Sequence, residues 1–416
     1  MQVQGTLQLP GDKSISHRAI MLSAIADGVS YVRNLNDGAD LQSTINILRD
    51  CGASIKQNEN EIIIYGKELY SPSKELDCGN SGTTTRLIAG LLSSQKLSFT
   101  LIGDKSLSRR PMKRIITPLV QMGCKISSND GLLPLSIDAS DGVSAIHYNM
   151  KVASAQVKSS ILFSALGGNN VSSVNEIIPT RNHSEIMLKN MGASIESEGS
   201  KIIVYPIKSK LKSIDISVPS DPSSAAFFVA LAVINNNSNL KLTNVLLNDS
   251  RIGFIEVLNK MNCLITKSNE SVHNGEKVGD LTISASNLKA IEIESKTIPS
   301  IIDEVPILAV VAAFAKGITV FKSVEELKYK ECDRLSAIIH NLEAFGINAY
   351  EKNNDLFVEG GKVERMSKIT TFDDHRIAMA FTILSLTSFE KYELDNMQCV
   401  DISLPNFFNY LSEVTK

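Results

Sequence analysis

The chain has 416 residues, a length that favours two domains, and its 43% apolar and 21% charged residues are typical of a globular protein. The net charge of −3 disfavours nucleic-acid binding, which normally needs a basic surface. No secretory leader follows Met1 and the longest apolar runs are too short to span a bilayer, so we expect a cytoplasmic protein without a membrane segment. The six scattered cysteines predict reduced thiols, and the six histidines form no cluster that would suggest a metal.

The first signal of an anion site lies at residues 9–18, Leu-Pro-Gly-Asp-Lys-Ser-Ile-Ser-His-Arg. A Pro-Gly turn is followed by Lys13, Ser14 and Arg18, and an apolar helical run begins there. Because a helix start offers free N–H groups and a positive dipole end, this pattern favours a phosphate or carboxylate ligand. A serine cap among solvated charges is the alternative interpretation, and the glycine spacing excludes a Walker loop.

A second such signal is Asp-Cys-Gly-Asn-Ser-Gly-Thr-Thr-Thr-Arg at residues 77–86. Gly79 and Gly82 permit close backbone approach, while Asn80, Ser81 and the three threonines offer donors before another apolar helix. A solvated Ser/Thr turn would give the same pattern. Further helix starts of this kind follow at residues 109–112, 154–160 and 180–185, and a plain capping role remains open for Ser154.

The second half of the chain adds carboxylates that could move protons. Asp303-Glu304 stands between apolar runs, and Asp373-Asp374-His375-Arg376 precedes an apolar helix. Opposite charges are interleaved at helical spacing in Lys-Glu-Cys-Asp-Arg at residues 330–334, where ion pairs on a solvated helix are the alternative interpretation.

One phrase recurs along the chain: a helical pattern ends, a glycine and a small residue follow, and a strand pattern begins. The glycine positions are 52, 123, 192 and 346, with Asn262 in a weaker copy. The period of about seventy residues predicts supersecondary units of a helix and a two-stranded ribbon, about six of which fit the chain. Each glycine lies where a helix C-cap favours positive φ. A turn-rich segment at residues 218–224 marks a candidate boundary that roughly halves the chain.

Together these segments resemble the 5-enolpyruvylshikimate-3-phosphate synthase family, also called 3-phosphoshikimate 1-carboxyvinyltransferases. The matching phrases are those at residues 9–18, 79–86, 109–112, 154–159, 330–334 and 373–379, in family order. The resemblance implies transfer of the enolpyruvyl group of phosphoenolpyruvate to the 5-hydroxyl of shikimate 3-phosphate, with release of phosphate, in chorismate and aromatic amino acid biosynthesis. It also implies a monomer that needs no metal or organic cofactor and is a target of glyphosate.

The resemblance assigns roles to matching residues. It implies that Asp303 accepts the proton of the 5-hydroxyl and that Glu331, together with Lys13, protonates the methylene carbon. The residues implied for shikimate 3-phosphate are Lys13, Ser14, Arg18, Ser154, Ala155, Gln156, Arg181, Asp303 and Lys330. Those implied for phosphoenolpyruvate are Lys13, Gly82, Arg110, Gln156, Arg334 and Arg376. Many relatives carry a late lysine near the last Pro-aromatic segment that contacts phosphoenolpyruvate, but residues 401–407 contain none.

The fold that the resemblance implies is α/β (α+β), with two similar domains of three βαβαββ units each, an inside-out α/β barrel. The expected domains are residues 12–220, and residues 1–11 with 221–416. Closure of these halves would bring Asp303, Glu331, Arg334 and Arg376 against Lys13 and Arg110 and exclude water.

Two other functions remain open at this point. UDP-N-acetylglucosamine enolpyruvyl transferases share the fold and donor, but they carry a cysteine in a loop before an Arg-Pro, and residues 102–109 have no cysteine. A non-catalytic anion-binding relative would need Lys13 and Arg110 but not Asp303 and Glu331. The presence of both acids disfavours it.

Overall fold

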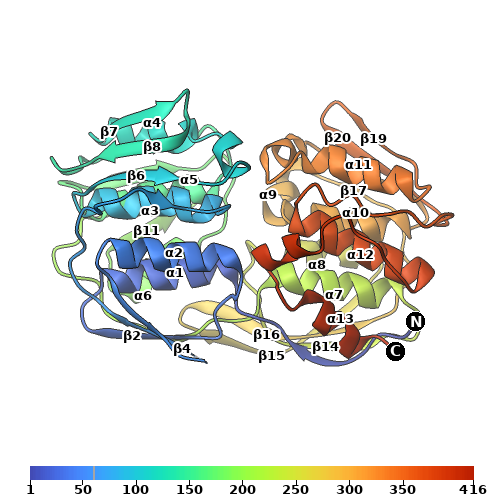
Figure 1. The fold of residues 1–416 in the computed structure, drawn as a ribbon. Coiled ribbons are helices and arrows are strands. Elements are labelled where there is room, and N and C mark those ends of the chain that lie inside the picture. The colour runs from blue at the N-terminus through green and yellow to red at the C-terminus, as the bar shows by residue number, and fades with distance from the viewer. Residues whose placement is uncertain (60) are drawn as a thin grey trace. The chain divides into compact units, whose positions relative to one another are not determined.

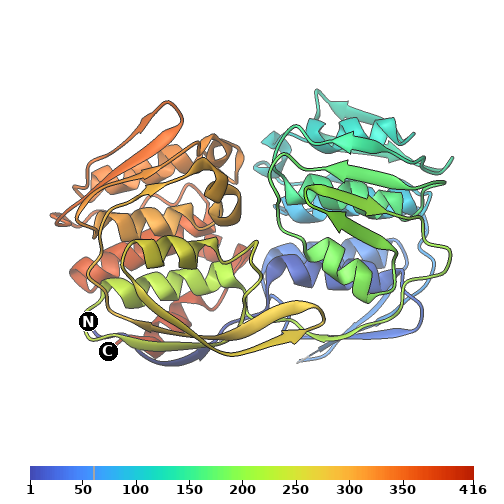
Figure 2. The same ribbon diagram turned by 180° about the vertical axis from the view of Figure 1, so that it is seen from behind.

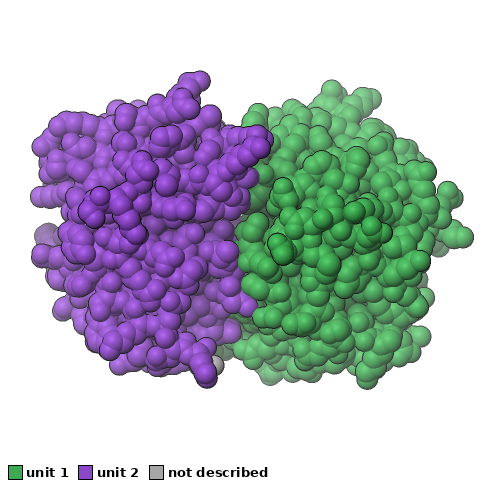
Figure 3. Space-filling view, viewed as in Figure 1, with its two compact units in different colours: residues 1–12, 219–416 green, residues 13–218 purple. Residues whose placement is uncertain are grey.

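The computed structural model describes residues 1–59 and 61–416, and the chain divides into two compact units. Unit 1 combines residues 1–12 with residues 219–416, and unit 2 consists of residues 13–218 (Figure 3). Unit 1 is thus formed by two separate stretches of the chain, whereas unit 2 is continuous.

The described residues of unit 2 form three four-stranded sheets with one strand arrangement. In each sheet two neighbouring strands run parallel, and a hairpin adds two antiparallel strands at one side. Their strand orders are β13 (Asp215–Ser217), β2 (Val29–Arg33), β4 (Glu61–Tyr65) and β3 (Ser54–Gln57); β5 (Leu76–Asp77), β6 (Ser98–Ile102), β8 (Leu132–Asp138) and β7 (Lys125–Asn129); and β9 (His147–Asn149), β10 (Ser172–Asn175), β12 (Lys201–Val204) and β11 (Ile195–Glu198). The helices are α1 (Lys13–Ala24), α2 (Ala39–Asp50), α3 (Gly82–Ser94), α4 (Lys113–Gln121), α5 (Ala155–Ala165) and α6 (His183–Asn190), with a 3-10 turn η1 (Leu107–Arg109).

Unit 1 repeats the same arrangement in two sheets. Their orders are β1 (Gln4–Gln8), β14 (Asn239–Leu246), β16 (Glu276–Ser284) and β15 (Leu264–His273); and β17 (Glu292–Ile293), β18 (Gly317–Phe321), β20 (Asp355–Gly360) and β19 (Ala349–Lys352). The helices are α7 (Pro222–Ile234), α8 (Gly253–Lys260), α9 (Ile298–Ile301), α10 (Val305–Ala313), α11 (Arg334–Ala344), α12 (His375–Phe389) and α13 (Phe407–Val414), with 3-10 turns η2 (Ser295–Thr297), η3 (Glu325–Tyr329) and η4 (Gln398–Ile402).

The last repeat differs from the others. After α12 the chain forms η4 and α13 where the earlier repeats form a hairpin. A parallel bridge joins Ile369, which precedes α12 in the chain, to Leu394, which follows it. The repeated fold is confirmed, but among the described residues the two-stranded ribbon occurs in five repeats rather than in all six.

The amino-acid pattern explains which helices lie inside each unit. Every residue of α7 from Pro222 to Val233 is buried, and α10 is buried throughout, because neither helix has a polar face. By contrast α4 buries only Ile115, Pro118 and Leu119 and exposes its other side. The ribbon views show the helices of each unit stacked in the middle, with the sheets toward the outside (Figures 1 and 2). No helix in the described part of the chain is long and apolar enough to cross a membrane.

The five junction residues of the repeat have the predicted backbone conformation. Their φ angles are 92° for Gly52, 101° for Gly123, 86° for Gly192, 73° for Asn262 and 87° for Gly346. Each follows the C-cap of a helix, where a left-handed residue ends the helix and turns the chain into the hairpin.

Helices α3 and α5 pack backbone against backbone. A Cβ atom on Gly90 would lie 2.1 Å from the carbonyl oxygen of Ser160, and one on Gly167 would lie 2.1 Å from that of Ser94. Because any side chain at either position would overlap the other helix, glycine is required for this close approach.

Candidate active site

In unit 2, the starts of α1, α3 and α5 carry most of the predicted anion-binding residues. Ser81 caps α3, where its hydroxyl accepts from the N–H of Thr84 at 3.1 Å. Ser154 caps α5 in the same way, accepting from Val157 N–H at 3.4 Å, and Ala155 is the first residue of that helix. The capping role left open for Ser154 is therefore present.

Gln156 joins the start of α5 to the start of α3. Its amide oxygen accepts from Arg86 Nη1 at 2.6 Å, and its amide nitrogen donates to Thr83 Oγ1 at 3.0 Å. Gly82 lies beside these groups: a Cβ added there would be 2.8 Å from Arg86 Nη1 and 2.9 Å from Arg110 Cζ. Thus Gly82, Arg86, Arg110 and Gln156 form one compact, cationic group.

The residues of the first motif are engaged by unit 2 itself. Lys13 Nζ lies 3.0 Å from Asp40 Oδ2. Arg18 is buried and donates to Ser184 Oγ at 2.7 Å, to Ser159 Oγ at 2.8 Å and to the carbonyl of Ser14 at 2.8 Å. Arg18 therefore ties α1 to α5 and α6. Arg181 lies between β10 and α6 and is partly exposed.

The hydroxyls of the second motif differ from the expectation. The sequence suggested that Asn80, Ser81 and the threonines offer donors to an anion, but Thr85 Oγ1 donates to the carbonyl of Ser81 at 2.9 Å and Thr84 Oγ1 bonds to Ser81 Oγ at 2.8 Å. Asn80 donates to Asp104 at 2.7 Å. Ser81, Thr84 and Thr85 are buried, so the solvated-turn interpretation is also wrong.

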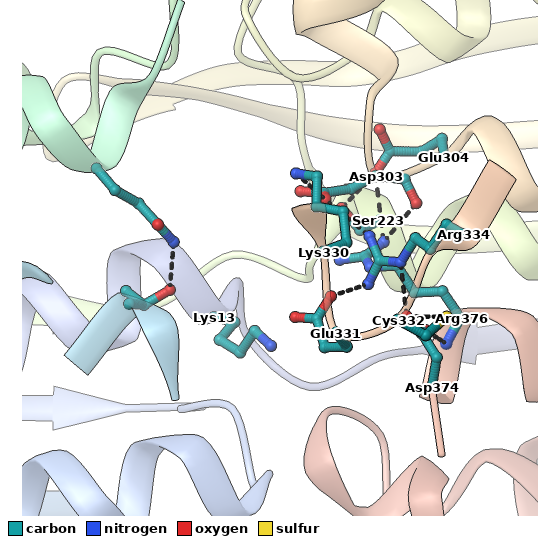
Figure 4. A network of polar contacts seen from close by, with 12 residues as sticks. Lys13, Ser223, Asp303, Glu304, Lys330, Glu331, Cys332, Arg334, Asp374 and Arg376 are labelled. Atoms are coloured by element: carbon teal, nitrogen blue, oxygen red, sulfur yellow. Dashed lines mark hydrogen bonds and ion pairs between the residues drawn. The ribbon is translucent and has the colours of Figure 1, made fainter. Parts of the chain in front are cut away.

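In unit 1, Arg334 joins three carboxylates (Figure 4). It lies 2.7 Å from Asp374 Oδ2, 2.5 Å from Glu331 Oε2 and 3.3 Å from Asp303 Oδ1. The side chain of Arg334 is 1% exposed, which rules out the solvated-helix interpretation of residues 330–334, although the Glu331 pair has helical i,i+3 spacing. Burial lowers the pKa of Arg334, but the charges of Asp374, Glu331 and Asp303 more than offset this and raise it above its usual value.

Asp303 lies at the centre of this group in unit 1. Its Oδ1 also lies 3.4 Å from Lys330 Nζ, and its backbone carbonyl accepts from Arg376 Nη1 at 2.9 Å. Arg376 Nη1 is in addition 3.7 Å from Glu304 Oε1. The structure therefore brings together all five predicted site residues of unit 1, which are Asp303, Lys330, Glu331, Arg334 and Arg376.

Exposure separates the acids of unit 1 into two kinds. The side chains of Asp303 and Glu331 are 16% and 17% exposed, whereas that of Asp374 is fully buried. Asp303 and Glu331 can thus reach a ligand, while Asp374 orients Arg334 and caps α12. Partly exposed carboxylates held beside fixed cations suit proton transfer near an anionic substrate.

Sequence reasoning gave no role to several residues that shape these groups. Asp40, Arg86 and Asp374 pair with residues 27, 70 and 40 positions away in the chain. Only the position of Arg86 at the end of the Gly-Asn-Ser-Gly motif could have singled it out. No group of three or more His, Cys, Asp or Glu side chains in the part of the chain that the structure describes is placed to hold a metal ion.

Comparison with known proteins gives consistent matches. Residues 1–411 match the family described as EPSP synthase (3-phosphoshikimate 1-carboxyvinyltransferase). The chain is 42% identical over 409 residues to a 3-phosphoshikimate 1-carboxyvinyltransferase of Thermoanaerobacter sp., covering 98% of this chain and 96% of that one. For the enzyme of that name from Clostridium tetani the identity is 40% over 417 residues, covering 99% and 94%. A solved structure of an EPSP synthase from Acinetobacter baumannii aligns with a TM-score of 0.86 at 37% identity, covering 99% of this chain and 96% of that one.

Proposed function

Because the chain belongs to the EPSP synthase family, we propose that it transfers the enolpyruvyl group of phosphoenolpyruvate to the 5-hydroxyl of shikimate 3-phosphate. This is 3-phosphoshikimate 1-carboxyvinyltransferase activity, in chorismate and aromatic amino acid biosynthesis. The structural observation that carries the proposal is the unit 1 group in which Arg334 holds Asp303 and Glu331, both partly exposed, next to Lys330. A non-catalytic anion-binding protein has no need of these two acids.

The chemistry proceeds by addition and elimination. The 5-hydroxyl oxygen forms a bond to C2 of phosphoenolpyruvate while its own proton is removed and a proton is added to the methylene carbon. Loss of a proton from that same carbon, now a methyl group, and of phosphate from C2 then restores the carbon–carbon double bond in the product. Each step therefore needs one group that accepts a proton and one that donates it.

We assign Asp303 as the acceptor of the hydroxyl proton and Glu331, with Lys13, as the source of the proton for carbon. Hydrogen bonds from Lys330 and Arg334 to one oxygen of Asp303 support this assignment, because they hold the carboxylate in one orientation. Arg334 likewise holds Glu331 at 2.5 Å. Because Arg334 holds both carboxylates in place, Asp303 can act as the proton acceptor while Glu331 acts as a proton donor.

The proposed substrate contacts rest on the family to which the chain belongs, and the charges of the substrates agree with them. Both substrates carry a phosphate and a carboxylate, and charge-assisted hydrogen bonds contribute about 1.5–3 kcal/mol each. We propose that shikimate 3-phosphate contacts Ser14, Arg18, Ser154, Ala155, Gln156, Arg181, Asp303 and Lys330, that phosphoenolpyruvate contacts Gly82, Arg110, Gln156, Arg334 and Arg376, and that Lys13 serves both. The positive dipole ends of α3 and α5, at the starts that Ser81 and Ser154 cap, support anion binding there.

The decisive experiment measures phosphate release when purified protein is mixed with phosphoenolpyruvate and shikimate 3-phosphate. We expect release only when both are present. Phosphoenolpyruvate with UDP-N-acetylglucosamine serves as the control for the related transferase. Phosphate release with the second mixture and not the first would overturn the proposal, and so would no release with either.

We further propose that the protein is a cytoplasmic monomer inhibited by glyphosate, with its domains at residues 12–220 and at residues 1–11 plus 221–416. Family membership supports the inhibitor, the location and the monomer. Light scattering coupled to gel filtration tests the monomer, for which a mass of 45.3 kDa is expected. A mass twice as large would contradict it.

A further inference from the structure

A buried ionic cluster in unit 2 lies outside the residues assigned above. Lys158, on the second turn of α5, has a side chain that is 1% exposed. Its Nζ lies 2.6 Å from Glu185 Oε1, in the first turn of α6, and 3.1 Å from Glu176 Oε2, just after β10. One ammonium group thus joins three consecutive elements of the fold.

The same cluster fixes the backbone next to Arg181. Lys158 Nζ donates to the carbonyl of Thr180 at 3.4 Å, and that carbonyl belongs to the peptide bond between Thr180 and Arg181. On its other side, the Thr180 N–H donates to Glu176 Oε1 at 3.0 Å, and the Thr180 hydroxyl donates to the same oxygen. Both peptide groups of Thr180 are therefore held by Lys158 and its partner.

A second layer of contacts supports the first. Ser159 and Ser184, the chain neighbours of Lys158 and Glu185, lie 2.7 Å apart and both accept hydrogen bonds from Arg18. The α5–α6 junction is thus fixed to α1, so movement of the segment that precedes Arg181 would have to take place within residues 176–182.

Stability alone does not explain the cluster. It contains one positive and two negative side chains, and Glu185 Oε2 is buried without a hydrogen-bond partner among the described residues. Apolar side chains of the same volume are often as stable as a buried ion pair or more so. In some proteins, however, buried ionic groups specify one arrangement of the segments that they join, and the contacts of Lys158 with three elements fit that use here.

We propose that Lys158 is a positioning residue for shikimate 3-phosphate, which acts by holding the Thr180–Arg181 peptide and thereby placing the Arg181 guanidinium. This inference rests on the proposed contact between Arg181 and shikimate 3-phosphate. Lys158 itself touches no substrate in this scheme. Its removal weakens the contact made by Arg181 and leaves the phosphoenolpyruvate contacts of Gly82 and Arg110 in place.

The test compares Lys158→Met, Arg181→Ala and the double variant in steady-state kinetics. We expect Lys158→Met to raise the KM for shikimate 3-phosphate about tenfold and to change the KM for phosphoenolpyruvate less than about twofold. In the Arg181→Ala background the same substitution adds less than about twofold, because the group that it positions is already gone. Lys189→Met, an exposed lysine on α6, removes the same charge without touching the cluster and should change neither KM.

The kinetic results distinguish an error in the proposed Arg181 contact from an error in the role given to Lys158. If Arg181→Ala leaves the KM for shikimate 3-phosphate unchanged, the proposed contact is wrong, and the inference fails with it. If Arg181→Ala raises that KM but Lys158→Met has the same effect in both backgrounds, or raises both KM values equally, only the inference is wrong.

A milder variant keeps the test valid if Lys158→Met does not fold, which circular dichroism would show. Glu176→Gln retains the side-chain volume and the acceptor for Thr180, but it removes one charge of the pair. We expect it to raise the KM for shikimate 3-phosphate about threefold with the same selectivity. An unchanged KM in folded Glu176→Gln protein would overturn the inference.

Discussion

Replacing Gly82 with alanine tests the proposed phosphoenolpyruvate site most directly. The added methyl group would lie 2.9 Å from both Cζ and Nη1 of Arg110 and 2.8 Å from Nη1 of Arg86, whereas ordinary contact begins at 3.4 Å. Each guanidinium must therefore move by about 0.5 Å, and the atoms that must move are the ends of two buried arginine side chains rather than backbone. Gly82 is the first residue of α3, and alanine at a helical position is favoured over glycine by about 0.4–1 kcal/mol, so we expect the variant to fold.

Displacement of Arg110 should weaken the binding of phosphoenolpyruvate. A charge-assisted hydrogen bond contributes about 1.5–3 kcal/mol, and a shift of this size costs part of it, about 1 kcal/mol or fivefold in KM. Glyphosate extends further than phosphoenolpyruvate in the proposed site and would also meet the methyl group. Overpacking by one methyl costs about 1–3 kcal/mol more, about 2–4 kcal/mol in all, so the glyphosate inhibition constant should rise at least about thirtyfold.

The assay measures phosphate release at fixed shikimate 3-phosphate, with both constants determined on one preparation. Gly361→Ala is the control, because a Cβ there has no atom within 4 Å, and it should change neither constant. Equal factors for glyphosate and phosphoenolpyruvate would refute the reasoning, since Gly82 would then serve only the geometry of its loop.

Asp303→Asn keeps an acceptor for Lys330 but removes the proton acceptor, so turnover should fall at least about a hundredfold while shikimate 3-phosphate binding remains measurable; near-normal turnover would show that Asp303 is not the base. The proposed contacts of phosphoenolpyruvate come from both units, so the radius of gyration measured by X-ray scattering should fall when both ligands bind, and an unchanged radius would contradict closure. Burial raises the pKa of the Cys78 thiol to about 12 and also raises that of Cys332, so native protein at pH 8 should react with Ellman's reagent far more slowly than unfolded protein; rapid reaction of all the thiols would be inconsistent with this.

The repeated fold could be predicted because its signal is local. A left-handed residue after a helix needs glycine or asparagine, and Gly52, Gly123, Gly192, Asn262 and Gly346 all meet that need. The last repeat has no such phrase, and its chain forms η4 and α13 instead of a hairpin. The number of two-stranded ribbons thus equals the number of helix–glycine–strand phrases in the sequence, rather than the six that the family fold implies.

The partners of the site residues were much harder to predict than the residues themselves. Lys13 and Arg334 stand out in the sequence, but the carboxylates that hold them, Asp40 and Asp374, lie far along the chain. Only the packing of α1 beside α2 and of α11 beside α12 brings these pairs together. The hydroxyls near Gly82 misled for a related reason, because composition does not reveal whether a serine bonds to a ligand or to its own helix.

The close approach of α3 and α5 should make positions far from any substrate intolerant of substitution. Gly90 and Gly167 would touch no substrate, yet they set the distance between the helices whose first two turns carry Arg86 and Gln156. A side chain at Gly90 would push the helices apart by an ångström or more (about 1–2 Å) and stretch that 2.6 Å bond at their ends. In a saturation-mutagenesis screen for growth, Gly90 should therefore be as restricted as a residue that binds the ligand. Sensitivity in such a screen would record the spacing of two helices as well as the chemistry of the site.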